Sequence, residues 1–479
     1  MNARRAIAMI LVAVVAVSCT QYKENRRLDR FRADAGYRFA TAEIPDDADA
    51  LFICLSFSGG GTRAAALAYG VMQKLEKTKI VRNGRRVSLL DEVDCISSVS
   101  GGSFTAAYYG LFGKERLGEF PERFLLRDIQ GELIARALNP VNWVRLASPW
   151  FSRIDLAAEL YDETVFEGKT FAALGEPLRR PFIMLNATDM VTGEPFTFTQ
   201  AQFDLLGSDL AAYQVARAVA ASSAFPFLLS PLTLVNHAPA PGFMPPEDYT
   251  RALGDREINR RRYEWARHRL DYLDSGRRPY VHLLDGGLGD NIGLRAITGE
   301  YLHSSGFLAP RAQGAIKRLV LIVVNARTAS RDSLSKSPRA PGLIPMAMAT
   351  ATVSMENYSF DTIEVAKELL AEGMRARREV AACQRALTRA CPAAPPLDPL
   401  PAMRTCVVEV SFEALRNASE RQHFLDLPTS FSLPREAVER IIAVGEQLLD
   451  ESPGFQSLLA ALAGEATLGA GVGGDGNCS

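Results

Sequence analysis

Three glycine-rich turns carry the side chains best suited to chemistry, and each follows a short apolar run. They are residues 58–64 (SGGGTRA), 97–103 (SSVSGGS) and 283–291 (LLDGGLGDN). In that order they supply a cluster of backbone amides, a serine hydroxyl and a carboxylate. Acyl transfer by a serine nucleophile needs these groups, provided that folding brings them to one point.

The first turn contains Gly59, Gly60 and Gly61 in succession, directly before a predicted helix. Without Cβ atoms, consecutive glycines allow backbone N–H groups to point inward, and the helix N-terminus adds a positive partial charge. Such a turn stabilises an anion, either a phosphate or a developing oxyanion. The spacing Gly59-x-Gly61-x-x-Ala64 also matches a relaxed dinucleotide-binding pattern, but no clear acidic residue ends a second strand about 20 positions later.

The second turn places Ser100 between a predicted strand and a predicted helix. A nucleophile elbow needs small residues two positions before and two positions after the serine, and Ser98 and Gly102 satisfy this spacing. The neighbouring Ser97 and Ser103 satisfy it less well. The alternative is an ordinary serine-rich loop, which this turn on its own would favour.

In the third turn, Asp285 ends an apolar run and is followed by two glycines that permit close approach of the backbone. A carboxylate here could act as a base, whereas the alternative is a structural carboxylate that caps the next turn. A Ser-His-Asp triad is also open, because His282 lies three residues before Asp285. Strand alternation would send these two side chains to opposite faces, which argues against the triad.

Short apolar runs alternate with helical patterns in the part of the chain that holds these turns. Strands are predicted at residues 51–57, 93–97, 182–186, 280–284 and 319–325, with helices at 64–75, 104–111 and 209–221 among them. The alternation predicts an α/β fold with three layers, α/β/α, and a mostly parallel central sheet. Functional residues should then gather beyond the carboxyl ends of the strands.

Together, the three turns resemble those of the patatin-like phospholipases, lipid acyl hydrolases that use a Ser-Asp dyad. The resemblance covers roughly residues 51–325 and includes the segments 59–63, 98–102, 186–189 with 192–193, 221–226 and 285–287. It implies a patatin-like fold with Ser100 as the nucleophile and Asp285 as the base. It also implies an oxyanion hole formed by residues 59–61 and Gly101, and a role for Arg63 in orienting that loop or contacting a phosphate headgroup.

The leading hypothesis is therefore a membrane-anchored serine acyl hydrolase that acts on phospholipids or related acyl esters, without a cofactor. A carboxylate with an ordinary pKa near 4 is a poor base at neutral pH, so Asp285 needs partial burial to raise its pKa. A second hypothesis is a non-catalytic lipid-binding or scaffold lipoprotein of the same fold, against which the intact Ser100 and Asp285 count. A nucleotide-binding protein is the third.

The N-terminus is predicted to direct export. Residues 1–5 carry two arginines, and residues 6–17 form an unbroken apolar run. This run is too short for a permanent membrane span, which needs about 20 residues, and fits a signal peptide. Residues 16–19 (AVSC) are similar to the lipobox of bacterial lipoproteins, which implies lipidation of Cys19 and an anchor in the cell envelope, at the periplasmic face or in the outer membrane. The alternative is an ordinary signal peptide with a cysteine near its end.

The composition is that of an ordinary globular protein, with 47% hydrophobic and 23% charged residues among 479. This excludes a disordered, collagenous or coiled-coil chain. The formal charge of −1 gives no support for nucleic-acid binding, and the five scattered histidines give none for a zinc site. Cys54 and Cys95 are predicted to be buried thiols, whereas Cys383 and Cys391 either pair or remain free.

Five segments are expected along the chain: a signal peptide (1–18), a tether and lead-in (19–48), a catalytic α/β domain (49–330), a mainly helical C-terminal extension (331–460) and a disordered glycine-rich tail (461–479). Residues 255–274 are predicted to form a charged helix inserted into the catalytic domain. Its arginines either pair with nearby acids on a solvated face or contact anionic lipid headgroups. The sequence does not identify a protein partner.

Overall fold

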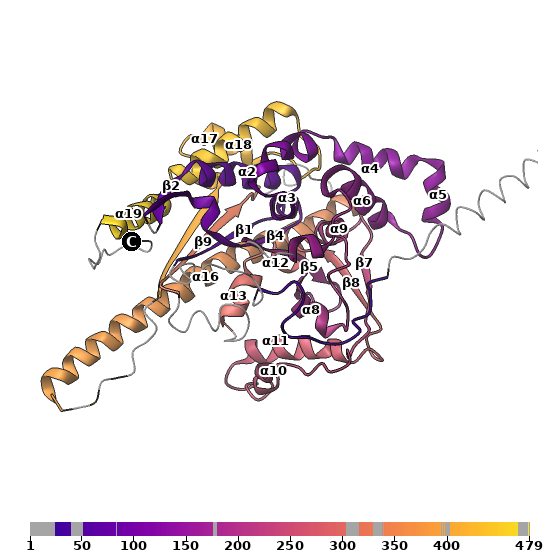
Figure 1. The fold of residues 1–479 in the computed structure, drawn as a ribbon. Helices are drawn as coiled ribbons and strands as arrows, with labels where there is room; N and C mark the ends of the chain where they lie inside the picture. Colours follow the sequence, from indigo (N-terminus) through magenta and orange to yellow (C-terminus); the bar gives the residue numbers. More distant parts are fainter. Residues whose placement is uncertain are drawn as a thin grey trace, which may run out of the picture.

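A mixed sheet of eight strands forms the centre of the molecule, with helices on both of its faces (Figure 1). The computed structural model describes residues 24–39, 51–82, 84–175, 180–302, 316–328, 338, 340–393, 395, 397, 403–467 and 478. The strands of the central sheet are β1 Leu51–Phe57, β4 Val93–Val99, β5 Phe182–Asp189, β6 Pro195–Thr197, β7 Leu232–Val235, β8 Tyr280–Asp285, β9 Arg318–Asn325 and β10 Arg404–Ser411. Two further strands, β2 Lys79–Arg82 and β3 Arg85–Ser88, form a separate hairpin.

The order across the central sheet is β10-β9-β1-β4-β5-β8-β7, and β6 pairs with β5. The five strands from β10 to β5 are parallel, whereas β6, β7 and β8 pair in antiparallel. Every residue of β1, β4, β5 and β9 is buried, as is typical of parallel strands that are covered on both faces. The predicted α/β fold with a mostly parallel sheet is confirmed.

Helices cover both faces of this sheet. They are α2 Gly61–Lys77, α3 Gly101–Arg116, α4 Ile129–Leu138, α5 Pro140–Leu146, α6 Arg153–Tyr161, α7 Phe171–Gly175, α8 Gln200–Leu205, α9 Val215–Ser222, α10 Glu247–Ala252, α11 Arg260–Leu270, α12 Gly287–Asp290, α13 Arg295–Leu302, α16 Leu343–Ala390, α17 Ala418–Leu425, α18 Arg435–Asp450 and α19 Pro453–Thr467. Alternate residues of β10 face the two layers. Glu409 pairs with Lys367 of α16 at 3.0 Å, whereas Val408 lies against Gly454 of α19.

The C-terminal region is part of the same fold as the catalytic segment. β10 pairs with β9 over its whole length, and α18 crosses α2 so closely that a Cβ atom at Gly70 would lie 2.2 Å from the carbonyl oxygen of Ile442. The prediction of a disordered tail from residue 461 is wrong for residues 461–467, which complete α19. Burial of Leu458 and Leu462 explains why the helix continues.

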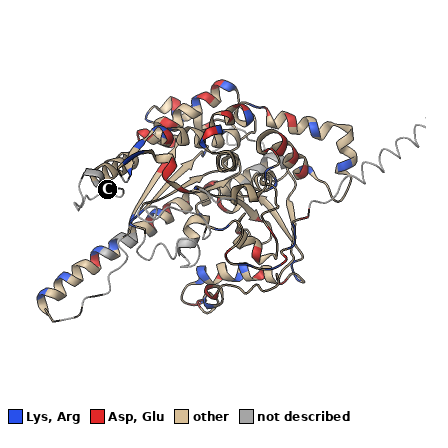
Figure 2. Cartoon of the chain, viewed as in Figure 1, with Lys and Arg blue, Asp and Glu red and all other residues tan. Residues whose placement is uncertain are grey.

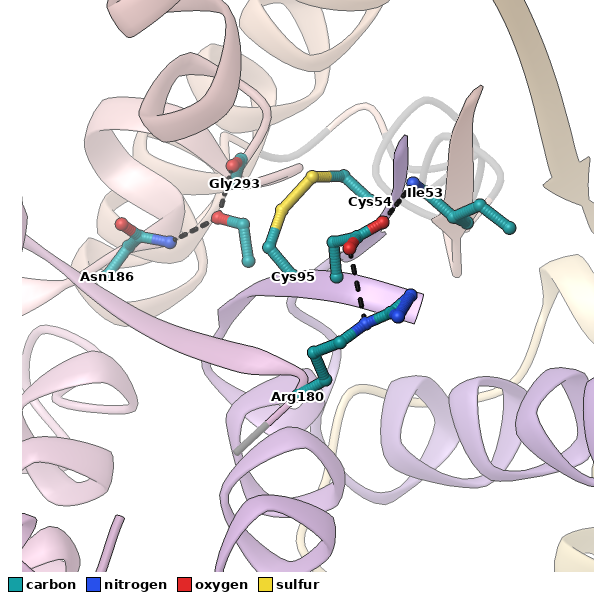
Figure 3. Close-up of a disulfide and its surroundings, with 8 residues drawn as sticks. Ile53, Cys54, Cys95, Arg180, Asn186 and Gly293 are labelled. Atoms are coloured by element: carbon teal, nitrogen blue, oxygen red, sulfur yellow. Dashed lines mark hydrogen bonds and ion pairs between the residues drawn. A yellow bond between two sulfur atoms is a disulfide. The ribbon is translucent and has the colours of Figure 1, made fainter. Parts of the chain in front are cut away.

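Cys54 and Cys95 lie opposite each other on the neighbouring strands β1 and β4 and form a disulfide (Figure 3). Both residues are buried, as predicted, but the prediction that they are thiols is wrong. Parallel strand pairing brings their α carbons to 4.7 Å, within the range that a disulfide bridges. Next to the bridge, the buried carboxylate of Asp94 pairs with Arg180 at 3.3 Å.

The other cysteines divide between a second bridge and two free thiols. Cys406 of β10 is bonded to Cys478. Cys383 and Cys391 are exposed and free, so of the two alternatives for this pair the free state holds. Cys383 lies within α16 and Cys391 just after its end, and eight residues of helix separate two positions by about 12 Å, too far for a disulfide.

The predicted charged insertion, residues 255–274, contains helix α11, where acidic and basic residues are mixed (Figure 2). Arg262 pairs with Asp255 at 2.7 Å, and Arg267 pairs with Glu264 at 2.8 Å. These pairs agree with the first interpretation of the insertion, a solvated face with internal ion pairs. Over the residues that the structure describes, no helix combines the length and the apolar character that a membrane crossing requires.

We expect the Cys54→Ala/Cys95→Ala double variant to lower the free energy of unfolding by about 3 kcal/mol, because this bridge closes a loop between residues 41 positions apart. Urea unfolding measures the change. The matched control, Cys383→Ser/Cys391→Ser, should leave the free energy unchanged because both side chains are exposed and unbonded. Reactive thiols at Cys54 and Cys95 in the denatured, unreduced protein would contradict the assignment.

Candidate active site

Ser100 occupies a strained turn between β4 and α3. Its backbone has a φ of 50° and a ψ of −120°, a conformation that residues other than glycine seldom adopt. β4 ends at Val99 and α3 begins at Gly101, so the hydroxyl lies at the carboxyl edge of the parallel strands. Ser100 is only 7% exposed. The turn therefore has the sharp strand-to-helix course that the spacing around Ser100 predicts.

Two side chains to which the sequence assigned no role hold this turn. Ser222, the last residue of α9, accepts a hydrogen bond from the Ser100 N–H at 2.9 Å and donates to the carbonyl oxygen of Asn186 at 2.6 Å. Asn186, on β5, donates to the hydroxyl of Ser97 at 2.8 Å and to the carbonyl oxygen of Ser98 at 3.1 Å. These buried hydrogen bonds offset the backbone strain at Ser100.

Asp285, the last residue of β8, brings its carboxyl group to Ser100. The carboxyl accepts a hydrogen bond, 2.8 Å long, from the N–H of Gly287, and the Ser100 side chain is close enough to lower the pKa of this carboxyl as a hydrogen-bonding partner. The residue is 2% exposed. Burial raises the pKa of Asp285 to about 7, and the hydrogen bonds from Gly287 and Ser100 oppose this rise. A carboxyl group with this pKa can exchange a proton near neutral pH.

The backbone around Asp285 is fixed by the same elements that fix Ser100. The N–H of Asp285 donates to the carbonyl oxygen of Ala224 at 3.0 Å, and the N–H of Gly286 donates to that of Ser222 at 3.0 Å. Thr188 of β5 donates its hydroxyl to the carbonyl oxygen of Asp285 at 2.8 Å. Because Ser222 contacts both turns, it sets the distance between the hydroxyl and the carboxyl.

The first glycine turn lies directly against the Ser100 turn. A Cβ atom at Gly101 would lie 2.0 Å from the carbonyl oxygen of Gly61, and a Cβ atom at Gly59 would lie 3.3 Å from the Cβ atom of Ser100. The first of these distances excludes any residue with a side chain at position 101. The absence of side chains therefore allows the amide cluster to approach the hydroxyl.

The backbone N–H groups of this region differ in whether they already donate a hydrogen bond within the protein. The N–H of Gly59 donates to the carbonyl oxygen of Asn291 at 2.9 Å. Gly59 therefore does not belong among the predicted oxyanion donors, because its N–H is already used. For Gly60, Gly61 and Gly101, the described residues offer no comparable acceptor to the N–H group. These three amides remain the candidates for binding an oxyanion.

Arg63 is buried and holds the glycine turn in place. Its guanidinium donates to the carbonyl oxygens of Ala326 at 3.0 Å and Leu427 at 2.6 Å, and to the hydroxyl of Thr429 at 3.0 Å. Burial lowers the pKa of Arg63 to about 10, an effect that the nearby Glu356 charge opposes. Of the two predicted roles, these contacts agree with orienting the loop, because the guanidinium is committed to the protein.

Helix α16 lies over the third turn. A Cβ atom at Gly287 would lie 2.1 Å from the terminal methyl carbon of Met355, and 2.8 Å from the side-chain oxygen of Asn291. The apolar methionine contributes to the dry surroundings that raise the pKa of Asp285. His282 is directed elsewhere, since its Nδ1 lies 3.0 Å from the hydroxyl of Thr233, and the burial pattern of β8 places it on the face opposite Asp285. A triad through His282 is therefore not formed.

The family model for patatin-like phospholipases matches residues 55–297, which is more than half of the chain and includes all three glycine-rich turns of this site. The chain belongs to the patatin-like phospholipase family. Its fold is the patatin fold, a mixed and mostly parallel sheet flanked by helices, with a helical C-terminal region in addition. Comparison with curated protein sequences gives no match.

Several solved structures are similar to this patatin-like chain at low identity. Human GIVD cytosolic phospholipase A2 is 15% identical with a TM-score of 0.42, over 94% of this chain and 64% of that chain. Its complex with methyl gamma-linolenyl fluorophosphonate gives 12% and 0.43, over 94% and 62%. VipD from Legionella pneumophila gives 13% and 0.31, over 94% and 73%. The patatin-like chain thus spans less than two thirds of the human chains.

The residues that the sequence left without a role share one signal. Asn186 and Ser222 lie in the segments 186–189 and 221–226, which the family resemblance includes, and Asn291 ends the third turn. All three are polar residues in or beside segments rich in apolar residues or glycine. Sequence alone gives no means of telling which of two catalytic turns such a residue supports, because their partners lie far away along the chain.

We expect kcat/KM for a soluble short-chain ester to increase about tenfold per pH unit below pH 7 and to level off above it, since the pKa of Asp285 is about 7 and a base must be ionised to accept a proton. Asp285→Asn should lower kcat by at least about a thousandfold at every pH, because the base is lost. Steady-state kinetics from pH 5 to pH 9 measure both effects.

Unfolding measurements provide the control. The raised pKa of Asp285 stabilises the folded state at low pH, and this stability is lost as the pH rises from about 4 towards 7, on the order of 4 kcal/mol in total. Asp285→Asn should therefore be at least as stable as the wild type at pH 8. A variant that unfolds at pH 8, or a wild-type pH profile that is flat from pH 5 to pH 9, contradicts this assignment.

Proposed function

We propose that the chain is a serine acyl hydrolase that cleaves acyl esters of phospholipids or related lipids. The observation that carries the proposal is the closeness of the Ser100 side chain to the buried carboxyl of Asp285, whose pKa burial raises to about 7. The amides of Gly60, Gly61 and Gly101 lie beside this pair. Membership in the patatin-like phospholipase family supports a lipid ester as the substrate.

The reaction proceeds in two steps, and in each of them Asp285 acts first as a base and then as an acid. Ser100 Oγ attacks the ester carbonyl carbon while Asp285 takes its proton, and the proton passes to the leaving alkoxide as the ester C–O bond breaks. Water then attacks the acyl-serine, and Asp285 takes a proton from that water. The proton returns to Ser100 Oγ as the fatty acid leaves, so the enzyme is regenerated without a cofactor.

Two helix N-termini stabilise the oxyanion in both steps. α2 begins at Gly61 and α3 begins at Gly101, and the backbones of these two residues are in contact. The positive ends of both helix dipoles therefore point at one place. Each fixed amide donor of this kind contributes about 3–4 kcal/mol to stabilising the transition state.

A non-catalytic lipid-binding protein of the same fold is the second candidate. Such a protein would have no use for a strained serine next to a carboxyl with a raised pKa, since both features lower the stability of the folded state. Their presence favours the hydrolase. A nucleotide-binding role has less support, because no clear acidic residue ends a second strand about 20 positions after the glycine turn.

A fluorophosphonate probe separates these candidates. We expect the wild-type protein to be labelled at Ser100, because the probe reacts with an activated serine, and we expect Ser100→Ala to show no labelling. The matched control is Ser98→Ala, which removes a buried hydroxyl from the same turn and should still be labelled. Labelling is measured by intact-protein mass spectrometry. A folded wild-type protein that is not labelled would rule out the hydrolase.

We further propose that the enzyme is exported and anchored in the cell envelope through lipidated Cys19. The sequence of residues 1–19 supports this proposal, although those residues lie outside the described part of the structure. The two disulfides add support, since such bonds are characteristic of oxidising compartments. An anchor would confine the enzyme to the surface that contains its substrate and so raise the effective concentration of lipid.

Metabolic labelling with a fatty-acid analogue tests the anchor. The wild-type chain expressed in a Gram-negative bacterium should take up the analogue, and Cys19→Ser should not, because the acceptor thiol is lost. Cys391→Ser serves as the control and should be labelled like the wild type. Equal labelling of Cys19→Ser and wild type would contradict the proposal.

A further inference from the structure

Two consecutive helices, α4 and α5, project from the body of the molecule (Figure 1). They expose large apolar side chains. We call these side chains, with one from a neighbouring loop, the hairpin face: Ile134, Leu138, Val141, Trp143, Trp150 and Phe227. Each is more than half exposed, from 52% for Ile134 to 66% for Val141. The chain contains three tryptophans, and two of them belong to this face. Several large apolar side chains exposed on one projecting hairpin and the loop bonded to it indicate an interaction site.

The connection between the helices is held rigidly. The indole N–H of Trp143 donates to the carbonyl oxygen of Ala137 at 3.0 Å, and Asn142 donates to that of Arg136 at 2.9 Å. Asn139 caps α5 by accepting from the N–H of Val141 at 3.0 Å. The exposure of the hairpin face is therefore a property of a fixed structure and does not reflect a loose loop.

One end of the hairpin is attached beside the glycine turn. At the start of α4, the side chain of Gln130 accepts a hydrogen bond from the Ser430 hydroxyl at 2.9 Å. The carbonyl oxygen of Ser430 in turn accepts the N–H of Thr62 at 2.8 Å and lies next to Gly61. A single residue, Ser430, therefore connects the start of α4 to the turn that contains the candidate oxyanion donors.

The other end is attached beside Asp285. Arg153, at the start of α6, donates to the carbonyl oxygen of Phe227 at 2.9 Å, and the N–H of Ile154 donates to Ser230 at 3.1 Å. This loop follows Ala224, whose carbonyl oxygen holds the N–H of Asp285. Phe227 has a φ of 71°, which is strained for a residue with a side chain, yet its ring is 64% exposed. The hairpin face therefore borders the active site on two sides.

The hairpin combines these apolar side chains with three arginines, Arg136, Arg145 and Arg153. Arg136 pairs with Glu163, and Arg145 pairs with Glu159 at 2.6 Å. Segments that lie in a membrane interface combine aromatic and aliphatic side chains with arginine or lysine in this way, and tryptophan prefers that depth. The arginines of α11 pair with acids in the same way, so the exposed apolar side chains, rather than the charge, distinguish the hairpin from that surface.

We propose that the hairpin face docks on a phospholipid bilayer and so places the entrance of the active site against the lipid surface. This proposal rests on the proposed lipid hydrolase function, because docking on a bilayer would bring the active site to its lipid substrate. The six side chains enter the boundary between headgroups and acyl chains, the arginines lie among the headgroups, and a lipid passes from the bilayer to Ser100 across the base of the hairpin.

Vesicle co-sedimentation tests the docking surface. The protein is the chain from Thr20 onward with Ser100→Ala, which keeps every contact described above except that from the Ser100 hydroxyl and removes any effect of hydrolysis. We expect it to bind phosphatidylcholine vesicles, and also vesicles that contain phosphatidylglycerol, because the exposed apolar side chains can enter the interface of both. Val141→Ser/Trp143→Ser should lower the partition coefficient about tenfold or more, since two large apolar side chains no longer enter the interface.

The matched control is Met244→Ser/Ile258→Ser. These side chains are 80% and 89% exposed near α10 and α11, on another side of the molecule, so their loss should leave the partition coefficient unchanged. Thermal unfolding checks that both double variants are folded, and Leu138→Ser provides a second probe of the face. Equal binding by the folded hairpin variants and the parent overturns the proposal, as does absence of binding to both kinds of vesicle.

Two further outcomes are distinguishable. If the hairpin variants instead halve the molar mass of the protein in solution, the face is a contact between two copies, and the proposal fails. If vesicles are bound through the hairpin face while the Ser100-containing chain shows no reaction with a fluorophosphonate, the docking surface stands and the proposed hydrolase function fails. Binding is measured in the Ser100→Ala chain, so the two results do not depend on each other.

Discussion

The structure of the site depends on keeping one carboxyl group out of water. Asp285 is buried and its pKa rises to about 7 because the charged form is poorly solvated there. The same burial would favour a permanently neutral acid if nothing stabilised the ion. The hydrogen bonds from Gly287 and Ser100 provide that stabilisation, so the group remains close to the balance between its two forms. Every element around the site serves to hold this balance.

Close backbone approach is the second requirement, and it links distant parts of the chain. Gly101 touches Gly61, so β1 with α2 and β4 with α3 bring two helix N-termini together. The C-terminal region strengthens this arrangement, because α18 crosses α2 and the segment after α17 accepts hydrogen bonds from Arg63. A region that the family model does not include thus supports the residues that it does include. The hairpin of α4 and α5 is attached beside the glycine turn at one end and near Asp285 at the other.

The pattern of apolar residues in the sequence was sufficient to predict most of the strands of the fold. Apolar runs predicted β1 with its observed bounds and located β4, β5, β8 and β9 within a few residues, because a parallel strand buried on both faces needs uninterrupted apolar side chains. The same pattern did not predict the disulfide between Cys54 and Cys95, which were expected to be buried thiols. Their bond depends on which strands are neighbours and in what register, and neither is encoded in the local pattern.

For the site, the sequence by itself determined which groups are present: a serine in a tight turn, a carboxyl at a strand end and a series of glycines. Their types and spacing suffice for this, because turn chemistry is local. Tertiary structure alone decided which amides are available, since the N–H of Gly59 is used by Asn291, more than two hundred residues away. It also decided the pKa of Asp285 and the role of Ser222, because burial and hydrogen bonding between distant segments exist only in the folded chain.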